Sequence, residues 1–140
     1  MNFHFINSPS KTDIGFIYNK LHEFNTEFFE TLKESDFCIF AKGINGEYIA
    51  GLYGKIIFTV ININYLWVSE SYRCQGLSKA LIEKVEIEAK NNGVEKLFVE
   101  TYTFQAVEFY SKLGFKEVGR YTDYPKSGID KVMFQKSVSN

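Results

Sequence analysis

A short polar segment that follows an apolar strand is the part of this sequence best suited to binding a charged ligand. It reads Arg73-Cys74-Gln75-Gly76-Leu77-Ser78, and a helix is expected to begin near Gly76. A helix start offers unpaired backbone N–H groups and the positive end of the helix dipole, so it attracts phosphate. Arg73 adds a permanent positive charge and Ser78 a hydroxyl donor. The segment predicts a phosphate-binding loop, although an ordinary helix terminus would give the same spacing.

The elements on either side of this loop must hold it in place. The preceding segment Ile61–Val68 is rich in β-branched and aromatic residues, which is typical of a strand. A helical stripe follows, with apolar residues four apart: Leu77, Leu81, Val85 and Ala89. Next comes a second strand, Glu95–Thr101. A strand–helix–strand unit of this kind indicates a parallel or mixed sheet whose faces are covered by helices.

Further elements are expected before and after this unit, all within one domain that spans residues 1–140. Before it, we expect a strand at Asn2–Asn7, a helix capped by Ser10 that extends to Phe28, a strand at Phe37–Ala41, and a strand that starts at Tyr48–Leu52 and continues through Lys55–Phe58. With Ile61–Val68, the last two strands suggest an antiparallel meander. After it, we expect a helix at Ala106–Leu113 and two strands at Phe115–Tyr121 and Lys131–Lys136.

Two segments together resemble the GNAT superfamily of N-acetyltransferases. The loop Arg73–Ser78 is similar to the family's coenzyme loop, and the aromatic strand Tyr65–Val68 precedes it as in the family. The segment Ala106–Phe115, which contains Phe109-Tyr110 and ends in Lys112-Leu113-Gly114-Phe115, is similar to a second family motif. The chain departs from the family at Ser78, where Gly or Ala is usual. Both motifs in the expected order identify the chain as a small, bacterial-type, single-domain member.

The resemblance implies a fold and a coenzyme site. The fold is of the mixed α/β or α+β class: a central, twisted, mixed but mostly antiparallel sheet of six to seven strands, with helices on both faces. The ligand is acetyl-CoA, used as a co-substrate. Its pyrophosphate is expected on the loop and its pantetheine arm along the preceding strand, where a splay from the strand Glu95–Thr101 admits it. The expected coenzyme-binding residues are Leu66, Trp67, Val68, Arg73, Cys74, Gln75, Gly76, Leu77 and Ser78.

Acetyl transfer to an amine also needs groups that move protons. A lysine-like amine has a pKa of about 10.4, so it must lose a proton before it can attack the thioester. The resemblance maps the family's tyrosine onto Tyr110, which we expect to protonate the departing thiolate; its spacing alone would favour a core residue. Glu100, at the end of a strand where some relatives carry a carboxylate, is the expected base. Alternative bases lie on the first helix: His22, Glu23 and Glu27.

The composition of the chain limits the kinds of molecule that it is expected to bind. The formal net charge is -1, which argues against a nucleic-acid or membrane partner. No histidine has a neighbouring ligand at metal-site spacing, so we expect no metal. The two cysteines, Cys38 and Cys74, are expected to be free thiols in the cytoplasm, with Cys38 buried and Cys74 reactive. The expected acceptor is a primary amine of a small cationic molecule. A lysine or N-terminal acceptor in a peptide, a non-catalytic acyl-CoA-binding module, and a homodimer all remain open.

Overall fold

The computed structural model describes residues 1–29 and 33–138, and the chain divides into two compact units, Met1–Leu32 and Lys33–Asn140. The first unit contains α1 (Lys11–Asn25). Ser10 caps this helix: its hydroxyl accepts a hydrogen bond from the Asp13 N–H, and the Asp13 carboxylate accepts one from the Ser10 N–H, both at 3.0 Å. The strand expected at Asn2–Asn7 is absent, so that prediction is wrong. A strand requires a partner for its backbone groups, and no other strand exists among residues 1–29.

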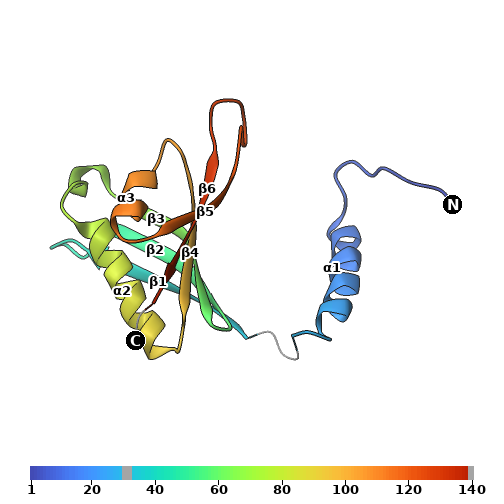
Figure 1. Cartoon of the computed structure of the whole chain (residues 1–140), viewed down its shortest axis with the longest axis horizontal. Coiled ribbons are helices and arrows are strands. Elements are labelled where there is room, and N and C mark those ends of the chain that lie inside the picture. The colour runs from blue at the N-terminus through green and yellow to red at the C-terminus, as the bar shows by residue number, and fades with distance from the viewer. Residues whose placement is uncertain (30–32, 139–140) are drawn as a thin grey trace. The chain divides into compact units, whose positions relative to one another are not determined.

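The second unit is built on one six-stranded sheet (Figure 1), whose strand order is β1-β2-β3-β4-β6-β5. The strands are β1 (Glu34–Lys42), β2 (Tyr48–Ile57), β3 (Val60–Val68), β4 (Lys96–Tyr102), β5 (Lys116–Tyr121) and β6 (Lys131–Ser137). Only β3 and β4 run parallel, because α2 (Leu77–Asn91) connects them and returns the chain to the same end of the sheet. The predicted mixed, mostly antiparallel sheet is therefore confirmed.

One face of the sheet carries the core of this unit. Inward-facing residues of β3, β4 and β6 pack with α2, which buries Leu81, Ile82, Val85 and Ala89. The short helix α3 (Val107–Lys112) adds Tyr110 to the same cluster. The largest fully buried side chains are Phe134, Ile61, Ile82, Leu97, Val85, Val94 and Val132. The predicted apolar stripe of α2 is thus the face that holds this helix against the sheet.

The two parallel strands separate halfway along their length. β3 pairs with β4 only from Val60 opposite Lys96 to Ile63 opposite Val99. At that point the register between β2 and β3 shifts, and Asn64 is the extra residue that bulges out. A bulge bends its strand and increases the local twist, so β3 turns away from β4 beyond Ile63. The splay expected between these strands is present.

Candidate active site

The loop before α2 presents a row of unpaired backbone donors. Gly76 is the N-cap of α2 with φ +83°, a left-handed conformation that glycine adopts without strain, and no side chain caps the helix. The first turn closes with the Ala80 N–H donating to the Gly76 carbonyl at 3.0 Å. None of the backbone N–H groups of residues 74–79 donates a hydrogen bond to the described chain. These groups, at the positive end of the helix dipole, form an anion-binding surface.

A side chain ties this loop to the end of β3. The Arg73 Nε donates to the Val68 carbonyl at 3.2 Å, which leaves the terminal guanidinium nitrogens available to a ligand. The Ser69 N–H donates to the Ile49 carbonyl at 2.8 Å, which makes Val68 and Ala50 a non-hydrogen-bonded pair. In such a pair both residues turn their backbone groups away from each other. The Val68 N–H and C=O therefore point into the space that β4 has left.

Two adjoining cavities follow the loop and the end of β3. The larger, of about 580 Å³, is lined by Leu66, Trp67, Val68, Arg73 and Ser78 among the expected coenzyme residues. The smaller, of about 250 Å³, adds Cys74, Gly76 and Leu77. Gln75 lines neither cavity, because its side-chain amide instead donates to the Ser71 carbonyl at 3.4 Å. Eight of the nine expected residues therefore lie together.

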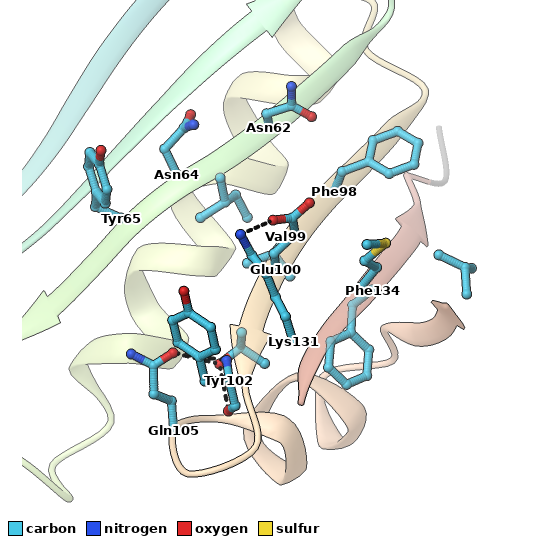
Figure 2. Close-up of a pocket in the computed structure, with 14 residues that line it drawn as sticks. Asn62, Asn64, Tyr65, Phe98, Val99, Glu100, Tyr102, Gln105, Lys131 and Phe134 are labelled. Carbon is cyan, nitrogen blue, oxygen red and sulfur yellow. Dashed lines mark hydrogen bonds and ion pairs between the residues drawn. The ribbon is translucent and has the colours of Figure 1, made fainter. Parts of the chain in front are cut away.

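Glu100 lies in a different cavity, of about 800 Å³, which is lined by residues of both β3 and β4 where the two strands separate. Its carboxylate accepts an ion-paired hydrogen bond from Lys131 at 2.9 Å, as Figure 2 shows. This hydrogen bond raises the pKa of Lys131 above its usual value. The side chain of Glu100 is half exposed, so it remains accessible to a molecule in the cavity. Gln105 lines both this cavity and the 580 Å³ cavity beside the loop, so the two adjoin there.

Tyr110 lies in the core. Its side chain is 4% exposed, and its ring contacts Phe109, Phe115 and Phe134 at centroid distances of 5.0, 5.4 and 6.0 Å. Burial raises its pKa to about 12. Tyr110 lines none of the three cavities described above, but the preceding residue, Phe109, lines both cavities beside the loop. The geometry thus gives the tyrosine a packing role and places it one residue from the lining of those two cavities.

Sequence reasoning missed the cationic and amide side chains of the Glu100 cavity. Lys131, Asn62, Asn64 and Gln105 line it, yet they come from β3, β6 and the turn before α3. No local pattern marks them, since only the pairing of β4 with β6 brings Lys131 near Glu100. Gln105 lies next to the Ala106–Phe115 motif, and that position was the one available signal.

The remaining residues singled out from the sequence lie on α1, just after it, and on β1. His22 and Glu23 lie on α1 and Glu27 follows it, within the unit Met1–Leu32. Cys38 is exposed on β1, so the expectation that it is buried is wrong: β1 is an edge strand, and Cys38 points away from its core-packed neighbours Phe37 and Ile39. Over residues 1–29 and 33–138, no cluster of His, Cys, Asp and Glu is suited to holding a metal ion. Nor is any helix in those ranges long and apolar enough to span a bilayer.

The fold and the coenzyme-type loop define a member of the GNAT acetyltransferases, and the chain belongs to that family. The sequence profile described as "Acetyltransferase (GNAT) family" matches residues 6–115. An acetyltransferase from Bacillus cereus ATCC 14579, known as a crystal structure, is 29% identical, and the superposition covers 96% of this chain and 97% of that one with a TM-score of 0.86. The family assignment made from the two motifs is confirmed.

Two further proteins with names that specify a substrate are similar to this chain. Blasticidin-S acetyltransferase from Streptomyces morookaense is 33% identical over 90 residues, a match that covers 64% of this chain and 66% of that protein, just under two thirds of its length. An aminoglycoside 6'-N-acetyltransferase crystallised with coenzyme A has a TM-score of 0.66 at 19% identity, covering 75% of this chain and 74% of that one. At that identity the second likeness shows the fold alone.

Proposed function

We propose that this chain is an N-acetyltransferase that transfers the acetyl group of acetyl-CoA to a primary amine of a small cationic molecule. One observation carries the proposal: the unpaired N–H groups of residues 74–79 adjoin a strand end whose backbone groups point into the splay. Phosphate and an extended pantetheine arm need these two surfaces side by side. The blasticidin-S relative supports a small-molecule acceptor. The interpretation of residues 1–140 as one domain remains a prediction.

The proposed coenzyme residues would bind acetyl-CoA in two ways, by positive charge and by backbone hydrogen bonds. Arg73 and the loop N–H groups would hold the pyrophosphate, and the Leu66–Val68 backbone would pair with the pantetheine arm. When bound, acetyl-CoA supplies an activated acyl group as a thioester. The Val68 N–H, turned toward the splay, is placed to donate to the oxygen that becomes negative during attack.

Glu100 and Tyr110 are the candidates for the two proton transfers of the reaction, from the amine and to the thiolate. Glu100 lies in the adjoining cavity and would take a proton from the incoming amine, which then attacks directly without an acyl-enzyme. A tyrosine with a pKa of about 12 would transfer its proton to a thiolate of pKa about 8.5 at a cost of about 5 kcal/mol. Tyr110 can therefore help only if the transfer is coupled to breaking the carbon–sulfur bond.

Binding of acetyl-CoA can be tested with the intrinsic tryptophan fluorescence of the chain. Trp67 is the single tryptophan and lines the larger coenzyme cavity, so its fluorescence should change when acetyl-CoA is added. A panel of small cationic amines and lysine-containing peptides is then screened for release of free thiol. Turnover of the small amines supports the proposal, and turnover of peptides alone moves the acceptor to the protein class. If neither fluorescence nor calorimetry detects acetyl-CoA at millimolar concentration, the proposal fails.

A further inference from the structure

The Glu100 cavity already holds a primary amine, that of Lys131. Its ammonium lies 2.9 Å from the Glu100 carboxylate and faces two aromatic rings, with centroids 5.8 Å away in Tyr102 and 5.4 Å away in Tyr124. A carboxylate together with aromatic faces is the environment that binds an alkylammonium. Figure 2 shows the Lys131 side chain reaching toward the Glu100 carboxylate, with their ion pair drawn as a dashed line.

This position meets one geometric requirement for an acetyl acceptor, a base within reach of the amine. A general base must lie about 2.6–3.2 Å from the atom whose proton it takes. The Lys131 Nζ satisfies this toward Glu100, and the cavity adjoins the coenzyme cavity at Gln105. We propose that, when no acceptor is present, the protein acetylates its own Lys131. The inference rests on the proposed function, since it requires acetyl-CoA and Glu100 acting as base.

The step balances without any further reactant. Glu100 takes one proton from the Lys131 ammonium, and the nitrogen lone pair forms a bond to the acetyl carbonyl carbon. The carbon–sulfur bond breaks, and the sulfur leaves as coenzyme A thiol with the second proton lost from the nitrogen. The proton on Glu100 passes to solvent. The products are an uncharged acetyl-lysine and free coenzyme A, so the modification removes the positive charge opposite Glu100.

A second ion pair provides a matched control within the same sheet. Lys55 pairs with Glu34 at 3.1 Å, and both lysines have raised pKa values because of hydrogen bonds to their carboxylates. Lys55 is the more exposed, at 37% against 25% for Lys131, and it lines none of the three cavities. Simple chemical acetylation should therefore modify Lys55 at least as fast as Lys131. Only a reaction directed by the site reverses that order.

The experiment incubates the purified full chain with acetyl-CoA and no amine, and maps acetyl-lysines by mass spectrometry over time. We expect one acetyl group per chain on Lys131, formed about 10-fold or more faster than on Lys55. The rate constant should not change on dilution, because the reaction is intramolecular. Lys131→Arg should abolish the labelling, whereas Lys55→Arg should leave it unchanged. Glu100→Gln should slow it about 10-fold, below the usual effect of about 100-fold or more for a lost base, because the amine also loses the ion pair that holds it protonated.

The failures of the two proposals are separable. If Trp67 reports acetyl-CoA binding and an amine is turned over while Lys131 stays unmodified, self-acetylation is overturned and the proposed function stands. Equal labelling of Lys131 and Lys55, or a rate that scales with protein concentration, also overturns it. If acetyl-CoA does not bind at all, both proposals fall together.

Discussion

The proposed coenzyme side and the proposed acceptor side of this site are formed by different chemical groups. The first consists mainly of backbone groups from one stretch of chain, namely the end of β3 and the loop before α2. The second consists of side chains from β3, β4 and β6, and its central contact joins Glu100 to Lys131 across 31 positions of sequence. The ligand common to a family can be held by backbone geometry, whereas a ligand particular to one member requires side chains that differ between members.

The largest expected effect is on acetyl-CoA binding to the proposed coenzyme side. Ser78→Asp places a carboxylate in the first turn of α2, where a pyrophosphate would bind. Repulsion between unit charges at short range should raise the Kd for acetyl-CoA about 100- to 1,000-fold. The fold should persist, because an acidic residue is favourable at a helix N-terminus. Trp67 fluorescence measures the Kd, with Ser78→Ala as the matched control; a change below about twofold in the Asp variant would place the phosphates elsewhere.

Tyr110 tests whether a core residue also takes part in the chemistry. Tyr110→Phe should lower kcat about 10- to 1,000-fold while leaving the Kd for acetyl-CoA nearly unchanged, because only a hydroxyl is lost. Thermal unfolding of the variant should resemble that of the wild type, since the three phenylalanine contacts remain. An unchanged kcat, with chemistry shown to limit turnover, would reduce Tyr110 to a packing residue.

On the acceptor side, Glu100→Gln should move the pH–rate profile for an accepted amine to higher pH, because the amine must then lose its proton unaided. At neutral pH we expect kcat/KM to fall about 10- to 100-fold, less than for many bases because water can substitute. Glu34→Gln removes the carboxylate of the other ion pair and should leave the profile in place. Superimposable profiles for Glu100→Gln and wild type would direct attention to His22, Glu23 and Glu27.

The burial of Tyr110 also predicts how stability depends on pH. Its folded pKa of about 12 exceeds the ordinary value of about 10, so the unfolded state loses this proton first as pH rises. The stabilisation is complete below pH 10 and is lost as pH rises through the folded pKa; by pH 11 the loss is about 1.4 kcal/mol. Urea unfolding at pH 9 and pH 11 should show this extra loss in the wild type and not in Tyr110→Phe. Parallel losses in the two proteins would contradict the assigned burial.

The smallest effect concerns the two cysteines, both of which are exposed. Brief treatment with iodoacetamide should label both Cys74 and Cys38, and coenzyme A should slow labelling of Cys74 about fivefold or more by covering the loop. Cys38, on β1, lines none of the three cavities and serves as the internal control. Mass-spectrometric mapping with and without coenzyme measures the ratio. Equal labelling of Cys74 in both samples would mean that the loop or its thiol faces away from the ligand.

The sequence allowed the strand, loop and helix around residues 66–78 to be predicted because their signals are local. The strand, turn and helix that hold residues 66–78 follow one another directly, and each has its own periodicity or capping signal. The same reasoning failed at Asn2–Asn7, where alternating apolar residues indicated a strand but pairing decides whether one forms. It also failed at Cys38, because an apolar run does not reveal which face of an edge strand is covered.

The cavity around Glu100 was predictable only in part. Glu100 could be selected because it ends a strand beside the splay, yet its partner Lys131 depends on the register of β4 with β6. Tyr102 pairs with Lys131 in that ladder, and this places the lysine close to Glu100, two residues back along β4. Such a register is set by the whole sheet and leaves no mark in the sequence near either residue.

The bulge at Asn64 also divides the sheet mechanically. β1–β2–β3 and β4–β6–β5 are two three-stranded ribbons joined through only four residue pairs, whereas β1 and β2 share nine and β4 and β6 share seven. The junction is therefore the most compliant line in the sheet, because few backbone bonds resist bending there. An extended molecule bonded to the free edge of β3 would brace the two ribbons along this line. Binding would then slow amide exchange in strands that the ligand never touches.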